Sequence, residues 1–160
     1  MERIAVIAGM GELPVLFLSE ASKRNCEMFP IYLFDEVDER VKKFPASIKY
    51  SITQVGKIIK YLKKNDIKKL IMLGKVEKNL VFSNLKFDIT AAKILLSSKN
   101  KKDKNILMAI VEYLASEGIT VLPQNYFLED YMVKEFNYTK RVPQEEDIKT
   151  IKIGIEAAKM

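Results

Sequence analysis

The chain has 160 residues, of which 48% are hydrophobic, so it is long enough to form one domain with a sizeable core. It contains no histidine and a single cysteine, Cys26, which excludes Ser-His and Cys-His catalytic arrangements, an internal disulfide and a thiol pair for metal or redox chemistry. Its 27 lysines and arginines outnumber 21 acidic residues, and the net charge of +6 favours anionic partners such as phosphates, nucleic acid or an acidic membrane face.

The sequence predicts neither a membrane-spanning segment nor a targeting segment. Its apolar runs are much shorter than the roughly 18 residues that a membrane-spanning helix needs. The N-terminus leads directly into a strand pattern, without the basic region and small-residue cleavage site of a signal peptide. We therefore expect a cytoplasmic protein.

The first 35 residues read as a β-α-β unit. The stretch "ERIAVIAG", residues 2–9, is an apolar, β-branched run that ends at a glycine, which is typical of a buried parallel strand. Residues 12–24 have apolar residues at helical spacing, and Pro14 is acceptable in the first turn because its missing N–H would be unpaired there. Residues 28–34 form a second strand pattern, followed by the acidic turn "DEVDER".

The alternation continues through the middle of the chain. Residues 46–52 predict a short third strand, residues 54–66 a helix, and residues 68–76 a fourth strand that again ends at a glycine. In the helix, Val55, Ile58, Ile59 and Leu62 form an apolar stripe, whereas Lys57, Lys60 and Lys64 share another face. This alternation predicts an α/β fold with a Rossmann-like, mostly parallel sheet and helices on both faces.

The remaining pattern is mostly helical. Helices are expected over residues 86–98 and 105–118, a last strand over 119–123 and a short helical turn within 124–133. In the second of these helices, a wide buried stripe is expected from Ile106, Leu107, Ile110, Val111 and Leu114. A final helix over 144–160 ends without a capping signal. We therefore expect a Rossmann-like domain over 1–143 and, over 144–160, the start of a connector helix to a further domain.

The "GMG" turn is the first candidate site. Gly9 and Gly11 lie between a strand and a helix, where backbone N–H groups and the helix dipole can hold an anion. Pro14 stands where a dinucleotide-binding fingerprint has its third glycine, which argues against ordinary NAD or FAD binding. Two interpretations stay open: a tight turn with no ligand, or a site for another phosphate or polar ligand.

The stretch "LGKVEKN" is the second candidate. Gly74, Lys75 and Lys78 follow a strand, and the carboxyl ends of parallel strands meet at one edge of a sheet. Together with the "GMG" turn, these residues predict a phosphate-binding crevice. Asp35, at the end of the second strand, is interpreted as a solvated turn acid in preference to a ribose-binding acid.

Two other patterns receive a structural interpretation. The Gly-Lys pair in "VGKIIKYLKK" lacks the upstream glycine of a P-loop, and its lysines are interpreted as a solvated helix face. No Asp/Glu cluster has the spacing of a metal site. Glu145, Glu146 and Asp147 are better explained by the dipole of the helix that they begin.

Four segments together resemble a known family. They are "IAVIAGMGELP", "QVGKIIKYLKKNDIKKLIMLGKVEK", "LMAIVEYLASEGITV" and "KRVPQEEDIKTIKIGIEAAK", in this order. They are similar to the N-terminal domain of UDP-2,3-diacylglucosamine pyrophosphatases of the LpxI type, which act in lipid A biosynthesis.

The resemblance implies an activity that needs a second domain. Enzymes of this type use water and a divalent metal, Mg²⁺ or Mn²⁺, to cleave UDP-2,3-diacylglucosamine into UMP and lipid X, which is 2,3-diacylglucosamine 1-phosphate. The metal-binding acids belong to a C-terminal domain, so the resemblance implies no catalytic residue and no metal in these 160 residues. It also implies transient, peripheral contact with the cytoplasmic face of the inner membrane, and it leaves a homodimer open.

The resemblance also implies which residues contact substrate. Four segments match motifs of the family. Gly9, Gly11, Leu13 and Pro14 match its Gly-x-Gly-x-Leu-Pro loop, and Gln54, Gly56 and Lys57 match its Gly-Lys helix start. Gly74, Val76 and Lys78 match its Ala-Gly-x-Val-x-Lys/Arg stretch, and Arg141 and Pro143 match its Thr-x-Arg-x-Pro segment. These residues are expected to shape the crevice and to contact sugar or phosphate.

Two alternatives remain from the sequence. A nucleotide-binding or phosphate-binding regulatory domain would need no catalysis. A nucleic-acid binder would fit the charge of +6 and the basic helix, but no recognisable nucleic-acid-binding module is present, so we expect no nucleic-acid partner.

Overall fold

The structure is a computed structural model that describes residues 1–76, 87–97, 103–134 and 139–159. It divides into two units, Met1–Asp130 and Tyr131–Met160, each of which is considered by itself. The domain boundary at residue 143 stays a prediction.

The first unit is built on a five-stranded sheet in the order β3-β2-β1-β4-β5, and every pair of neighbouring strands is parallel. The strands are β1 (Glu2–Ala8), β2 (Cys26–Tyr32), β3 (Ile48–Lys49), β4 (Lys69–Leu73) and β5 (Thr120–Val121). In the centre of the sheet, Ile4 of β1 lies opposite Met28 on one side and Lys69 on the other. The predicted parallel sheet is confirmed.

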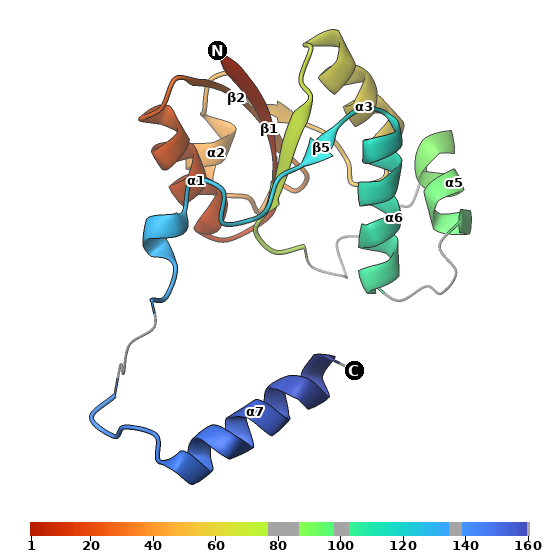
Figure 1. The fold of residues 1–160 in the computed structure, drawn as a ribbon. Helices are drawn as coiled ribbons and strands as arrows, with labels where there is room; N and C mark the ends of the chain where they lie inside the picture. Colours follow the sequence, from red (N-terminus) through yellow and green to blue (C-terminus); the bar gives the residue numbers. More distant parts are fainter. Residues whose placement is uncertain (77–86, 98–102, 135–138, 160) are drawn as a thin grey trace. The chain divides into compact units, whose positions relative to one another are not determined.

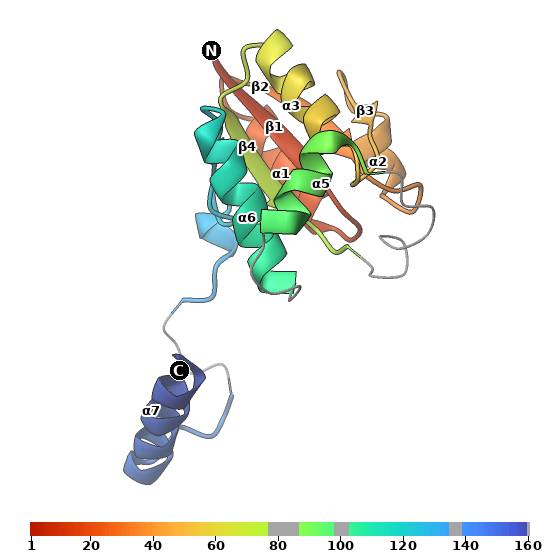
Figure 2. The same cartoon turned by 90° about the vertical axis from the view of Figure 1, so that its right-hand side faces the viewer.

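Helices cover both faces of this sheet (Figures 1 and 2). Helices α1 (Leu13–Ser22) and α2 (Glu39–Lys42) lie on one face, and α3 (Val55–Lys64), α5 (Ile89–Ser97) and α6 (Asp103–Ser116) lie on the other. The chain thus winds first to one side of β1 and then to the other, as the Rossmann-like prediction requires.

The core lies between the central strands and these helices. Ile4, Val6 and Ile31 of the sheet and Phe17 of α1 are fully buried. Each large apolar side chain removed from water in this way contributes about 1.5–3 kcal/mol before entropy is counted. This packing fixes the ends of β1 and β4, from which the candidate site extends.

The turn predicted after β2 is present but ends earlier than expected. Residues 35 and 36 lie in a turn, and α2 begins at Glu39, because the Asp38 carboxylate accepts a hydrogen bond from the Arg40 N–H at 2.8 Å and caps a short helix. The buried stripe predicted for α6 was too wide: Leu114 is buried, but Leu107 is 50% exposed. The neighbouring strand β5 has two residues, so it offers α6 little sheet to cover.

The second unit contains α7 (Glu145–Lys159), and the 3-10 helix η1 (Glu129–Tyr131) spans the boundary between the units. At the start of α7, the Asp147 carboxylate accepts a hydrogen bond from the Gln144 N–H at 2.9 Å, as in half of a capping box. Among the described residues, no helix has both the length and the hydropathy that a membrane span requires.

Candidate functional site

The strand order creates a switch point between β1 and β4. The chain proceeds from β1 to β2 and β3 on one side, and β4 and β5 lie on the other side. In open parallel sheets, ligands bind in the crevice that forms at the carboxyl ends of the two strands flanking such a point. Here the loop of residues 9–12 leaves β1 and the loop of residues 74–76 leaves β4 at this place.

The two loops are joined through their backbones. The Gly9 N–H donates to the Leu73 carbonyl at 2.8 Å. The Met10 N–H donates to the Lys75 carbonyl at 2.9 Å, and the Lys75 N–H donates to the Met10 carbonyl at 2.8 Å, which forms a short antiparallel bridge. The structure therefore brings the two glycine-containing strand ends together, as the sequence pattern predicts.

Two glycines make this close approach possible. A Cβ on Gly9 would lie 2.4 Å from the Lys75 carbonyl oxygen. Gly74 has a φ of +90°, and a Cβ there would lie 2.7 Å from the Met10 carbonyl oxygen. A side chain at either position would force the loops apart. The fold therefore requires glycine at both positions, whether or not a ligand binds.

The bridge also decides which donors remain for a ligand. It uses the N–H groups of Met10 and Lys75, so an anion would have to be held by residues 11–13, which lead into α1. Glu12 is the N-cap of α1 and makes no side-chain capping hydrogen bond. The positive end of the α1 dipole therefore lies at the carboxyl end of β1 without a side-chain cap.

The neighbouring side chains have different positions. Leu13 is 38% exposed at the start of α1, whereas Pro14 is fully buried and supports the loop from the core. Lys75 is exposed, and within the part of the chain that the structure describes its ammonium group makes no ion pair. Lys75 is thus a cation at the crevice that can meet a phosphate oxygen.

An ion-pair network that the sequence reasoning missed borders the loop. Arg40 Nη2 lies 2.6 Å from Glu12 Oε1 and 2.7 Å from Asp38 Oδ2. The Arg40 side chain, together with its backbone N–H, lowers the pKa of Asp38 to about 2. The pKa of Arg40 is raised, first by Asp38 and then by Glu12. This guanidinium offsets the negative charge of Glu12 beside the crevice.

Gln54 and Gly56 form hydrogen bonds within the chain at the start of α3. The Gly56 N–H donates to Asp88 Oδ2 at 2.7 Å, and the Ala91 N–H donates to Asp88 Oδ1 at 2.8 Å. One carboxylate therefore caps both α3 and α5. Gln54 Oε1 accepts a hydrogen bond from the Ser51 N–H at 3.1 Å. These contacts are internal to the fold, and contact of Gln54 and Gly56 with substrate stays a prediction.

Two further predicted residues, Lys57 and Asp35, lie elsewhere. Lys57 is exposed on α3 and lines a groove beside β3. Lys78 lies outside the described residues. Asp35 is 78% exposed and pairs with Lys49 at 2.5 Å, which lowers the pKa of Asp35 and is consistent with a turn acid.

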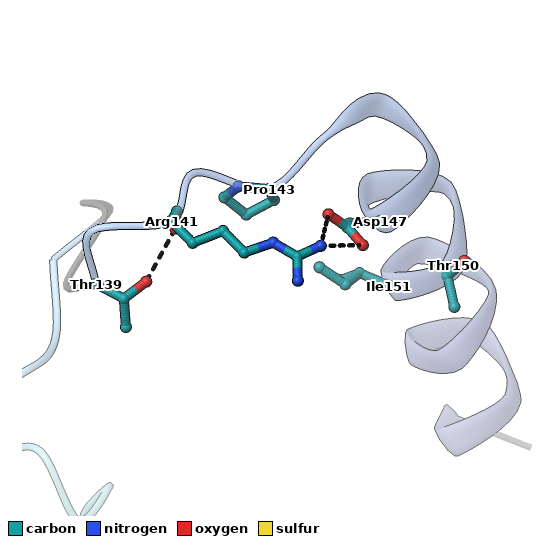
Figure 3. Close-up of a pocket in the computed structure, with 6 residues that line it drawn as sticks. All are labelled: Thr139, Arg141, Pro143, Asp147, Thr150 and Ile151. Carbon is teal, nitrogen blue, oxygen red and sulfur yellow. Dashed lines mark hydrogen bonds and ion pairs between the residues drawn. The ribbon is translucent and has the colours of Figure 1, made fainter.

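Arg141 belongs to the second unit, where it lines an open hollow of about 400 Å³ (Figure 3). Its Nη2 atom lies 3.1 Å from Asp147 Oδ2, and its carbonyl accepts a hydrogen bond from Thr139 Oγ1 at 2.9 Å. The Arg141 side chain is 80% exposed. Its contact with substrate stays a prediction.

The described residues do not fit a divalent metal. In the ranges of the chain that the structure covers, no three Cys, Asp or Glu side chains gather in a way that could hold a metal ion. The crevice instead offers backbone N–H groups, a helix terminus and a lysine, which are groups that bind anions. Binding of an anionic ligand there stays a prediction.

The comparisons with known proteins identify a family. The LpxI N-terminal domain matches the chain over residues 3–131. The match covers nearly all of the first unit and includes both loops of the crevice, α3 and Asp88. No curated protein gives a significant match.

Proposed function

This chain belongs to the LpxI family, which acts in lipid A biosynthesis, and we propose that its first unit is the substrate-binding domain of a UDP-2,3-diacylglucosamine pyrophosphatase. In the proposed reaction, water cleaves one P–O bond of the pyrophosphate and releases UMP and lipid X. The water oxygen ends on one phosphate, and its hydrogens are divided between the products and the solvent according to pH.

The joined loops at the switch point carry this proposal. The Met10–Lys75 bridge fixes the position of the uncapped α1 terminus relative to the Lys75 backbone. A phosphate at the crevice would accept hydrogen bonds from the N–H groups of residues 11–13 and would attract the Lys75 ammonium group. Fixed donors of this kind hold a substrate in one orientation, which lowers the entropic cost of the later chemical step.

We propose that this unit binds substrate and that a second domain supplies the groups that activate water and hold the divalent metal. The resemblance of the sequence to the LpxI type supports this division of labour. On this proposal, the 160 residues alone bind weakly and hydrolyse nothing measurable. Measurable hydrolysis of UDP-2,3-diacylglucosamine by this chain with Mg²⁺ or Mn²⁺ would contradict it.

The acyl chains of the substrate imply that the protein contacts a membrane. A molecule with two acyl chains is held in a bilayer, so the protein would meet it at the cytoplasmic face of the inner membrane. The excess of lysine and arginine would favour this peripheral contact with anionic lipids.

The test is a thermal-shift measurement with lipid X and, separately, UMP. A ligand that binds only the folded state raises the melting temperature. We expect lipid X to stabilise the wild type and to lose most of this effect in Lys75→Ala. Lys68→Ala is the matched control, because Lys68 lies just before β4, away from its carboxyl end, and pairs with Asp66 at 3.3 Å.

The outcomes separate the candidate functions. Equal stabilisation of Lys75→Ala and the wild type by lipid X would contradict the assignment of the crevice. Stabilisation by UMP alone that is lost in Lys75→Ala would favour a nucleotide-binding domain without catalysis. No stabilisation by either ligand would contradict substrate binding by these 160 residues.

A further inference from the structure

A second basic surface lies beside the edge strand β3, which β2 separates from β1 and the switch point. We call it the lysine groove. It has a volume of about 530 Å³ and is lined by Ile48, Tyr50, Lys57, Lys60, Tyr61 and Lys64 together with Asn65. Its walls come from β3, from the residue that follows β3 and from one face of α3, so its position is set by the packing of that helix on the sheet.

The groove follows from the two-sided pattern of α3. Ile58, Ile59 and Leu62 are buried in the core, which turns the face with Lys57, Lys60 and Lys64 outward. These lysines are three and four positions apart, so they lie above one another on the helix. At 1.5 Å per residue, they extend over roughly 10 Å. The sequence interpretation of a solvated face was incomplete, because these lysines share a hollow with two aromatic rings.

The lysines of the groove have no acidic partner among the described residues. None of its lining residues within the described chain is acidic. In that same part of the chain, Lys57, Lys60 and Lys64 form no ion pair, whereas Lys63 on the same helix pairs with Glu117 at 2.5 Å. Neighbouring ammonium groups repel one another, so an anion bound between them would relieve this repulsion.

The aromatic wall adds a second kind of contact. The rings of Tyr50 and Tyr61 have centroids 5.9 Å apart and are tilted by 59°. Burial raises the pKa of Tyr61 above its ordinary value of 10.0. A tyrosine hydroxyl is protonated at neutral pH and can donate a hydrogen bond. Tyrosine rings offer an apolar face to a base or a sugar, and lysines bind phosphate oxygens as charged donors.

We propose that the lysine groove binds a nucleotide, with the phosphate on the lysines and the base or sugar ring against Tyr50 and Tyr61. The volume of about 530 Å³ falls within the roughly 300–1,000 Å³ of small-molecule sites. The lysines line a hollow between two elements, which suits a compact ligand better than a flat bilayer. This site is separate from the crevice and does not depend on the proposed function.

The experiment is an NMR titration of ¹⁵N-labelled chain with UMP, with inorganic phosphate and with phosphatidylglycerol vesicles. We expect UMP to shift the amide signals of Tyr50, Lys60 and Tyr61 and to bind more tightly than phosphate. The double variant Lys60→Ala/Lys64→Ala should weaken UMP binding by about tenfold or more. A hydrogen bond to a charged group contributes about 1.5–3 kcal/mol, and 1.4 kcal/mol corresponds to about tenfold in affinity. Both lysines are exposed, so the variant should keep its fold.

Two variants serve as controls. Lys63→Ala removes the same charge from the same helix but lies outside the groove, so UMP affinity should stay within about twofold of the wild type. Lys75→Ala tests the crevice. If it abolishes the UMP shifts while the double variant leaves them intact, UMP binds in the crevice, and the groove proposal is wrong while the proposed function stands.

Three other results would overturn the proposal. Equal affinity for UMP and inorganic phosphate would show that the ring is not recognised. Unchanged UMP binding in the double variant would remove the lysines from the site. Binding of anionic vesicles through the groove, without binding of UMP, would identify the surface as a lipid-headgroup contact.

Discussion

Met10 and Lys75 exchange two backbone hydrogen bonds, one in each direction, with lengths of 2.9 and 2.8 Å. The pair joins the loop after β1 to the loop after β4, which flank the switch point of the sheet. Because the bond partners are backbone groups, the geometry depends on the close approach of the two loops and not on the side chains of Met10 and Lys75. The two loops are therefore held together without any ligand, which would reduce the ordering cost of the proposed binding.

The first prediction concerns the glycine that permits this contact. In Gly9→Ala, the new Cβ would lie 2.4 Å from the Lys75 carbonyl oxygen, so the two loops must separate. We expect a loss of about 1–3 kcal/mol in the free energy of unfolding, measured by urea denaturation. Gly154→Ala is the control, because its Cβ meets nothing within 4 Å and it lies in α7. Equal stability of Gly9→Ala and the wild type would show that the loops can part freely.

The second prediction concerns Asp88, whose two oxygens accept from Gly56 at 2.7 Å and Ala91 at 2.8 Å. Asp88→Ala removes the caps of α3 and α5 together. We expect a loss of about 1–3 kcal/mol in the free energy of unfolding, since one cap contributes about 0.5–2 kcal/mol. Asp88→Asn keeps one acceptor oxygen and should lose less. If both variants unfold at the same urea concentration as the wild type, the carboxylate does not stabilise the two helices.

The course of the sheet could be predicted from the sequence because its signals are local. Short apolar runs ending at Gly9 and Gly74, separated by a helical pattern, indicate parallel strands with loops at one edge. The meeting of those loops followed from the topology alone. The bridge between Met10 and Lys75 could not be predicted, because backbone hydrogen bonds between loops leave no side-chain pattern.

Contacts between distant residues explain most of what the sequence reasoning missed. Arg40 lies within an acidic run, and nothing near it indicates that its guanidinium reaches Glu12, 28 positions away. Asp88 had a usable signal, since an aspartate three residues before Ala91 is typical of an N-cap. Its second contact, with Gly56, has a separation of 32 positions and no local signal.

The third prediction is a pH dependence at the amino edge of the sheet. The Glu2 carboxylate accepts a hydrogen bond from Lys69 at 2.6 Å, and Lys69 is the main cause of a Glu2 pKa below its ordinary value of 4.5. A lowered pKa in the folded state contributes stability above the unfolded pKa, and this contribution is lost as the pH falls through the folded pKa. We therefore expect the free energy of unfolding to fall below about pH 4.5.

Glu2→Gln should flatten this part of the curve, because a neutral amide does not titrate. Urea denaturation at pH 7 and at low pH measures the effect in both proteins. Glu36→Gln is the control, since Glu36 is an exposed acid in the turn after β2. If the wild type and Glu2→Gln lose the same amount of stability as the pH falls, other carboxyl groups cause the acid sensitivity.

The last prediction concerns Arg40, which joins Glu12 at the start of α1 to Asp38 at the start of α2. In Arg40→Ala, the pKa of Asp38 should rise from about 2 toward its ordinary value of 3.8, because the side-chain hydrogen bond that is its largest cause is gone. NMR titration of the Asp38 carboxyl carbon measures this change.

The same variant leaves the Glu12 carboxylate without its cation, beside the loop that is proposed to hold phosphate. Lipid X should then bind about twofold to fivefold more weakly, since an exposed carboxylate repels a phosphate modestly. Arg40→Lys, which keeps the charge but not the two-sided guanidinium contact, should fall between the wild type and Arg40→Ala. A raised Asp38 pKa with unchanged lipid X affinity would separate the network from the crevice and would limit Arg40 to a structural role between α1 and α2.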